Sequence, residues 1–312
     1  MKNFPKIALG AWAWGNDGTF GGELKADSLR PIFDEAMKAG LNLWDTAFAY
    51  GMGTSEKVLA SFLKDLPRDS FLVSDKFTPQ CVQNASSASA FKDMIEMQLS
   101  LMNLDRFDIY WIHNVVDSPK WISALAEYFE GKADAPLIGV SNHNLAEIKQ
   151  ADEILKSRGL KLSAVQNHYS LINRSSEDSG ILNWCKENGA TFFSYMVLEQ
   201  GALSGKYDVA HPMPEGSARA QTYNPVLSKL EILNAELKTI AQKYGVQTAQ
   251  IPVAWAIAKG TLPIIGVTKT QHVKDAQKAA NIALSANEIA HLEETAAKLK
   301  INAIRFWEKE MK

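Results

Sequence analysis

The sequence predicts an α/β protein in which eight parallel strands, each followed by a helix, close into a (β/α)8 barrel. Short apolar runs alternate with amphipathic helical patterns along the whole chain. The predicted strands begin about every thirty residues, which is the span of one strand–helix unit. The 312 residues also suffice for such a barrel with insertions. The regular spacing favours one domain over residues 1–312 rather than two separate domains.

The predicted strands are short and rich in apolar and β-branched residues. They cover residues 6–9, 41–45, 71–76, 107–113, 137–141, 164–167, 191–195 and 262–265. The predicted helices cover residues 28–39, 55–63, 90–102, 118–129, 145–157, 180–187, 227–244, 248–258, 273–280 and 286–298. An open doubly wound sheet would need a Gly-x-Gly-x-x-Gly segment after an early strand, and Gly18, Gly21 and Gly22 have the wrong spacing.

Two segments depart from the strand–helix rhythm. Residues 196–226 form a long loop rich in Gly, Pro and Ser, followed by an extra helix. A loop that follows a barrel strand lies at the mouth where active sites are built, so we expect this loop to border the site. A C-terminal helix and tail occupy residues 285–312, and the tail carries Phe306 and Trp307. The tail is expected either to cross the mouth or to pack outside the barrel.

Composition narrows the class of protein. With 46% hydrophobic residues, 22% charged residues and a net charge of −2, the chain is typical of a globular protein and does not favour nucleic-acid or membrane binding. The first residues lack the apolar run of a signal peptide, so we expect a cytoplasmic protein. We also expect a monomer or a small homo-oligomer. The two cysteines, Cys81 and Cys185, have neither metal-ligand spacing nor the number of a disulfide framework, and no metal is predicted.

Polar residues end most of the predicted strands. In chain order they are Asp45, Lys76, His113, Ser141 with Asn142, Gln166 with Asn167, and Tyr195. Any one of them alone has a structural explanation, such as a satisfied ion pair or a hydrogen-bonded core histidine. Their repetition on successive strands favours an active site, because the carboxyl ends of barrel strands meet at one mouth.

The segment 41–51 contains two residues expected to take part in the reaction, Asp45 and Tyr50. Alternation along a strand places Leu43 and Asp45 on the same face, and a carboxylate facing a packed interior needs a cation. Lys76 is the expected cation, and the following turn presents Tyr50. The same alternation points Asp75 away from the barrel interior, so we expect a structural role for it.

Several fragments, taken in order, resemble the aldo-keto reductase family over nearly the whole chain. They are Leu9-Gly10-Ala11-Trp12, Trp44-Asp45-Thr46-Ala47 with Tyr50-Gly51, Gly53-Thr54-Ser55-Glu56, Lys76, Tyr110-Trp111-Ile112-His113, Gly139-Val140-Ser141-Asn142, Gln166 with Tyr169-Ser170-Leu171, Gly201-Ala202-Leu203-Ser204-Gly205-Lys206-Tyr207 and Pro263-Ile264-Ile265-Gly266-Val267-Thr268-Lys269. The resemblance implies hydride transfer from NADPH, or from NADH as an alternative, to an aldehyde or ketone. The reverse reaction would oxidise an alcohol.

The resemblance implies a catalytic tetrad that agrees with the chemistry of the residues. Tyr50 would donate the proton to the carbonyl oxygen, and Lys76 would lower the pKa of its phenol. Asp45 would hold Lys76 in place. His113 would orient the carbonyl, or assist proton transfer if it is charged.

The resemblance also implies the cofactor contacts. Ser141, Asn142 and Gln166 would bind the nicotinamide carboxamide, and Tyr195 would stack on its ring. The remaining expected contacts are Leu198, Gly201, Gly205 and Lys206 with the pyrophosphate, and Thr268, Lys269, His272 and Asp275 with the adenosine and 2′-phosphate. His272 stands where many relatives carry arginine, so the preference for NADPH is expected to be soft.

The expected substrate is a small-molecule carbonyl compound in a pocket walled by Trp12, Trp14, Phe48 and Asn114. Two alternatives stay open. The first is a nucleotide-binding regulatory subunit with little turnover. The second is a non-redox isomerase or lyase that forms a Schiff base on Lys76, which pairing with Asp45 would disfavour.

Overall fold

The computed structural model describes residues 4–20, 23–302, 304–305, 308–309 and 311. The strands of this part of the chain form a closed parallel barrel in sequence order, with β1 paired to both β2 and β8. They are β1 (Ala8–Gly10), β2 (Leu43–Asp45), β3 (Leu72–Phe77), β4 (Ile109–Ile112), β5 (Leu137–Ser141), β6 (Leu162–His168), β7 (Thr191–Tyr195) and β8 (Leu262–Gly266). The predicted (β/α)8 barrel, the TIM-barrel architecture, is thereby confirmed, and each predicted strand overlaps an observed one.

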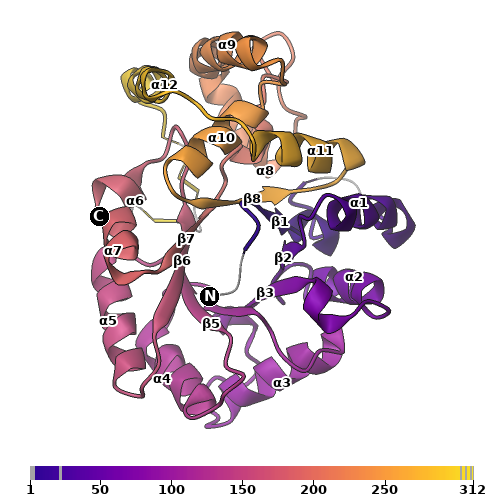
Figure 1. Cartoon of the computed structure of the whole chain (residues 1–312), viewed down its shortest axis with the longest axis vertical. Helices are drawn as coiled ribbons and strands as arrows, with labels where there is room; N and C mark the ends of the chain where they lie inside the picture. The colour runs from indigo at the N-terminus through magenta and orange to yellow at the C-terminus, as the bar shows by residue number, and fades with distance from the viewer. Residues whose placement is uncertain (1–3, 21–22, 303, 306–307, 310, 312) are drawn as a thin grey trace.

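Helices surround the barrel as an outer ring (Figure 1). They are α1 (Ala26–Lys38), α2 (Thr54–Leu63), α3 (Ala90–Met102), α4 (Ser118–Phe129), α5 (Leu145–Lys156), α6 (Ser175–Asp178), α7 (Ile181–Asn188), α8 (Ala218–Tyr223), α9 (Leu227–Tyr244), α10 (Gln250–Ala258), α11 (Thr270–Ala279) and α12 (Ala286–Leu299). The short helices α6 and α8 were not expected, because four to six residues carry too little periodicity to predict a helix. No helix within the described ranges is long and apolar enough to cross a membrane.

Two apolar layers explain why the strands have almost continuous apolar runs. Inside the barrel, Leu43, Ile109, Trp111, Ala164 and Phe193 pack together. A larger layer fills the space between the outer faces of the strands and the helices. Strands buried on both faces need apolar residues throughout, so a polar residue at a strand end stands out.

The strand register brings the expected polar residues to one end of the barrel. Gly10 pairs with Asp45, Asp45 with Ser74, and Lys76 with Trp111. Gly139 on β5 lies against the Trp111 indole, and a Cβ there would lie 2.2 Å from the ring. Glycine at position 139 therefore lets Trp111 pack inside the barrel beneath the polar mouth.

Candidate active site

Tyr50 lies in the turn after β2, and two glycines fix that turn. Gly51 has a φ of +66°, and a Cβ on it would lie 1.9 Å from the carbonyl oxygen of Gly15. The backbone of the segment Trp12–Gly15 therefore touches the turn directly, which only glycine permits. This contact sets the direction in which the phenol of Tyr50 leaves the chain.

Lys76 is the centre of the mouth. Its side chain is fully buried, and its Nζ donates to Asp45 Oδ1 at 2.5 Å, to the Thr46 carbonyl at 2.8 Å and to Tyr50 Oη at 3.2 Å. Burial lowers the pKa of the ammonium, but the charges of Asp45 and Tyr50 outweigh burial and raise it overall. Lys76 is therefore a charged, immobile ammonium that contacts the phenol.

Asp45 is held by more than the lysine. Its Oδ2 accepts hydrogen bonds from Ser74 Oγ at 2.8 Å and from Gln166 Nε2 at 3.1 Å. Ser74 in turn accepts a hydrogen bond from Trp111 Nε1 at 2.7 Å. A buried carboxylate with this many donors is satisfied in its charged form.

Tyr50 has a raised pKa in this structure. Burial is the largest cause, Lys76 opposes it, and the charges of Asp45 and Asp75 add to it. The expected influence of Lys76 has the right sign, but the expectation of a net lowering is wrong, because burial of the phenol outweighs the cation. The Tyr50 ring stacks on Trp12 at 5.6 Å between centroids and meets the His113 ring edge-on at 5.8 Å.

His113 follows β4 and faces the phenol. Its Nδ1 shares a hydrogen bond with Thr78 Oγ1 at 2.7 Å. Burial and the nearby charge of Lys76 lower the pKa of His113 to about 3. The imidazole is thus neutral at neutral pH, which favours the orienting role over assistance by a charged ring.

The residues expected to bind the nicotinamide lie beside this tetrad. Tyr195 Oη donates to Asn142 Oδ1 at 2.5 Å, and Asn142 Nδ2 donates to the carbonyl of His113 at 3.2 Å. Asn142 Nδ2 also donates to Ser141 Oγ at 3.3 Å. Gln166 reaches the tetrad through Asp45, as described above. The structure therefore brings these four side chains together around one part of the mouth.

The residues expected to bind the adenosine end lie near α11. The pKa of His272 is lowered by burial and by the charges of Lys269 and Lys206, so these two cations face the histidine. His272 Nδ1 accepts a hydrogen bond from the Thr268 amide at 3.3 Å. Asp275 accepts from Gln250 on α10 at 2.7 Å and from Gln271 on its own helix at 2.9 Å, which ties its carboxylate to α10.

Leu198, near the start of the loop after β7, is half-buried, and the loop contains three glycines with left-handed backbone, the third being Gly216. Gly201 has a φ of +99° and Gly205 a φ of +72°. A Cβ on Gly205 would lie 3.1 Å from the Thr248 side chain. The glycines therefore allow a tight loop, and Lys206 beside them is exposed.

The expected substrate pocket needs two corrections. Trp12 stacks on Tyr50, and Asn114, which follows His113, donates through Nδ2 to Gln80 Oε1 at 2.7 Å; both side chains are half-buried. Phe48 is also half-buried, but its ring lies beside Gly53 and packs against the core outside the barrel. Trp14, however, is completely buried among apolar rings, and its Nε1 donates to the Val267 carbonyl at 2.8 Å. This position removes Trp14 from the pocket wall and makes it part of the core behind β1.

The described part of the C-terminal tail lies on the mouth side of β6. Glu308 Oε2 contacts His168 Nδ1 at 3.0 Å, and His168 Nε2 contacts Glu199 Oε1 at 2.6 Å. Lys309 pairs with Glu147 at 2.5 Å. Of the two expected paths, the tail thus takes the one over the mouth, whereas Phe306 and Trp307 lie outside the described residues.

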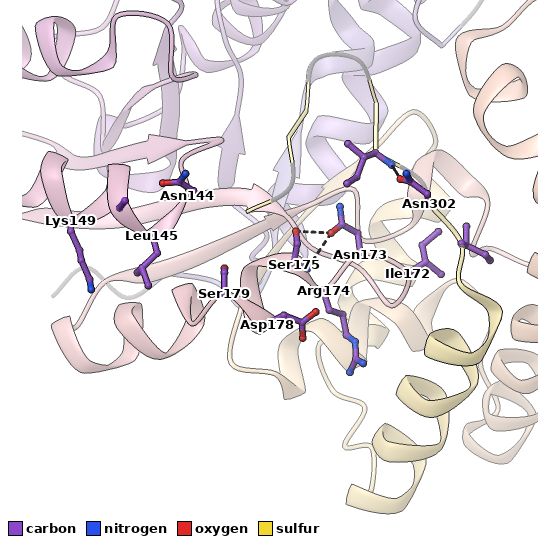
Figure 2. A pocket seen from close by; sticks show the side chains of 13 residues that line it. Asn144, Leu145, Lys149, Ile172, Asn173, Arg174, Ser175, Asp178, Ser179 and Asn302 are labelled. Atoms are coloured by element: carbon purple, nitrogen blue, oxygen red, sulfur yellow. Dashed lines mark hydrogen bonds between the residues drawn. The ribbon is translucent and has the colours of Figure 1, made fainter. Parts of the chain in front are cut away.

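An open cavity of about 850 Å³ lies between the start of α5, the loop after β6 and the tail (Figure 2). Its lining includes Asn144, Lys149, Arg174, Asp178 and Asn302. No tetrad residue lines it, and no sequence pattern pointed to it. We assign the chemistry to the tetrad instead, because there a buried ammonium contacts both a carboxylate and the hydroxyl of Tyr50.

Sequence reasoning missed three groups that support the tetrad: the Thr46 carbonyl, Ser74 and Thr78. Ser74 could have been found, because strand alternation places it on the same face as Lys76. The Thr46 carbonyl and the Thr78 hydroxyl gave no signal, since their roles depend on contacts between separate strands.

Comparisons with known proteins agree with this geometry. A model of the Aldo/keto reductase family matches residues 6–297. The chain is 30% identical to the chloroplastic pyridoxal reductase of Arabidopsis thaliana, over 92% of this chain and 82% of that protein. It is 27% identical to the NADH-specific methylglyoxal reductase of Escherichia coli, over 95% of each. An aldo-keto reductase from Klebsiella pneumoniae in complex with NADPH superposes with a TM-score of 0.73, at 21% identity, over 98% of this chain and 95% of that one. The chain therefore belongs to the aldo/keto reductase family.

Proposed function

We propose that this protein transfers hydride from NADPH to the carbonyl carbon of an aldehyde or ketone, reversibly, with Tyr50 as the general acid and base. One observation carries the proposal: the buried ammonium of Lys76 contacts both the Tyr50 hydroxyl and the Asp45 carboxylate. The family and its reductase-named relatives support carbonyl reduction in general.

Each tetrad residue has a separate role in the proposed reaction. A reduced nicotinamide, when bound, supplies the hydride, which no side chain can provide. Tyr50 donates its proton to the carbonyl oxygen as negative charge develops there. Lys76 stabilises the resulting phenolate, and Asp45 keeps Lys76 charged and in place. His113, neutral and bonded through Nδ1 to Thr78, would orient the carbonyl with Nε2.

The donor set suits a phosphorylated dinucleotide. Lys206 and Lys269 face His272 near the N-terminal end of α11, where a phosphate also gains from the helix dipole. Tyr195 and the amides of Asn142 and Gln166 offer a ring face and amide groups suited to a carboxamide. Because His272 is held neutral, the discrimination against NADH rests on the lysines. The soft preference predicted from the sequence is therefore retained.

The half-buried ring of Trp12 offers an apolar wall beside Tyr50, and Asn114 offers one amide. Such a pocket suits a small or planar aldehyde, and the names of the relatives suggest pyridoxal and methylglyoxal as the first compounds to test.

The test is NADPH consumption by the purified protein against pyridoxal, methylglyoxal, simple ketones and keto-sugars. We expect measurable turnover with at least one aldehyde, and moderately slower turnover when NADH replaces NADPH. Tight NADPH binding without turnover on any carbonyl would replace this proposal with the regulatory subunit. A borohydride-trapped adduct on Lys76 would replace it with Schiff-base chemistry.

A further inference from the structure

Two acidic side chains meet behind the catalytic lysine, on the outer face of β3. Asp75 belongs to β3 and Glu56 to α2, and both are fully buried. The two carboxyl groups lie within hydrogen-bonding contact of each other. Neither Asp75 Oδ2 nor Glu56 Oε2 has a hydrogen-bond donor elsewhere in the described part of the chain.

The other oxygen of each carboxyl group is already in use. Asp75 Oδ1 accepts the backbone N–H of Lys76 at 2.8 Å, and Glu56 Oε1 accepts from Gln98 Nε2 at 2.9 Å. Two ionised carboxylates in contact and away from water repel each other strongly, and each would leave an oxygen without a donor. A single proton shared by the two carboxyl groups removes both costs.

We propose that Asp75 and Glu56 share one proton between Oδ2 and Oε2, and that this singly charged pair is a positioning element for Lys76. The proposal rests on the proposed function, since it is the tetrad that the pair would position. It extends the structural role expected for Asp75, whose carboxyl points out of the barrel as strand alternation predicted.

The pair fixes the backbone on both sides of Lys76. Asp75 holds the Lys76 N–H, while Gln98 Nε2 donates to the Lys76 carbonyl at 3.2 Å as well as to Glu56. Gln98 Oε1 accepts a hydrogen bond from Tyr110 Oη at 2.5 Å. The peptide groups that flank the catalytic lysine are thus anchored to α2, α3 and β4.

The electrostatics agree with a shared proton. Burial and the neighbouring Glu56 raise the pKa of Asp75 well above its usual range, and burial raises the pKa of Glu56. The charge of Asp75 in turn raises the pKa of Tyr50. The titratable groups that face the pair are Lys57 on α2, Lys76 on β3, Tyr110 on β4, and Cys81 and Tyr50 in loops.

The first test detects the proton itself. Infrared spectra of the wild-type protein at neutral pH should contain a protonated-carboxyl stretch that shifts in D2O. We expect Asp75→Asn and Glu56→Gln each to lose this band, because an amide supplies the shared hydrogen and leaves the partner ionised. The matched control is Glu127→Gln, an exposed carboxyl on α4, which should keep the band. Absence of the band in the wild type, or its survival in both single variants, would overturn the shared proton.

The second test measures the effect on the tetrad, through the pH profile of kcat for NADPH-dependent aldehyde reduction. Each single amide variant keeps one negative charge, so the limb at which activity falls with rising pH should stay in place. The double variant Asp75→Asn/Glu56→Gln removes that charge and should move the limb about one unit lower, since Tyr50 then deprotonates more easily. An unmoved limb in the double variant would overturn the positioning role. The infrared result needs no turnover, so it stands or falls separately from the proposed function.

Discussion

The lysines at the two ends of the barrel mouth, within the tetrad and beside α11, differ in their burial. Lys76 is fully buried and donates to three acceptors, one of them a carboxylate. Lys206 and Lys269, near α11, are exposed to solvent. The comparison teaches that folding alone assembles the tetrad, whereas the end of the mouth proposed to bind the phosphate consists of solvated charges.

Different consequences follow for mutation at the two ends. A buried ion pair that loses one partner leaves a charge without water or counter-charge, which destabilises the fold. An exposed cation that is removed costs the fold little and changes only the binding of an anion.

Lys76→Met is expected to have the largest effect. It removes the cation beside Tyr50 and strands the Asp45 carboxylate in the interior, so kcat should fall by at least about 1,000-fold. The free energy of unfolding should also fall by about 3–5 kcal/mol. Steady-state kinetics and denaturant unfolding measure the two losses.

The control is the double variant Lys76→Met/Asp45→Asn. It removes both charges, so most of the lost stability should return while activity stays low. Recovery of activity in this variant would mean that the ammonium does not act on Tyr50.

The buried charges on the β6 side of the mouth predict a pH-dependent stability. The pKa of His168 is raised to about 10, because Glu199 and Glu308 outweigh burial. Its folded pKa exceeds its unfolded value of about 6.5, so the stabilisation is full below that value and is lost as pH rises towards 10. The free energy of unfolding should drop by about 3–5 kcal/mol across this window, and by less in His168→Gln. Equal slopes for the two proteins would contradict this assignment.

Lys269→Ala tests the exposed end. We expect the Kd for NADPH to rise about tenfold, because one charge-assisted contact with a phosphate is lost. The Kd for NADH and the stability should change little. Lys274→Ala, at an exposed position on α11, is the matched control. Equal losses for both cofactors would place the phosphate elsewhere.

Protonation of His113 is expected to have the smallest effect. It should not change kcat on the acidic side of the pH profile. The pKa of about 3 keeps His113 neutral throughout the physiological range. The kcat for reduction should therefore lack an acidic limb near the ordinary histidine pKa of about 6.5. A limb at that pH that disappears in His113→Gln would show that the charged ring takes part.

The sequence was sufficient to predict the barrel. Strands that are buried on both faces and recur at one interval are compatible with few other folds. The sequence also pointed to Asp45, Lys76 and His113, since polar residues at the ends of apolar strands are conspicuous. Their proximity could be expected because parallel strands end at one mouth. The structure brings these groups and Tyr50 together.

Features set by packing between distant segments could not be predicted. Periodicity cannot distinguish a tryptophan at the mouth from one behind it, so Trp14 was misplaced. The net pKa of Tyr50 depends on how burial competes with one cation, which no spacing records. The shared-proton contact of Asp75 needs the position of α2 relative to β3. The path of the tail depends on the buried charges around His168.

The central claim is that the phenol of Tyr50, set beside Lys76, gives the proton to the carbonyl oxygen. The most direct measurement compares kcat and NADPH affinity in the wild type and in Tyr50→Phe, which keeps the ring and removes the hydroxyl. The account predicts a fall in kcat of at least about 1,000-fold with the Kd for NADPH nearly unchanged. Turnover at the wild-type rate in Tyr50→Phe would contradict it.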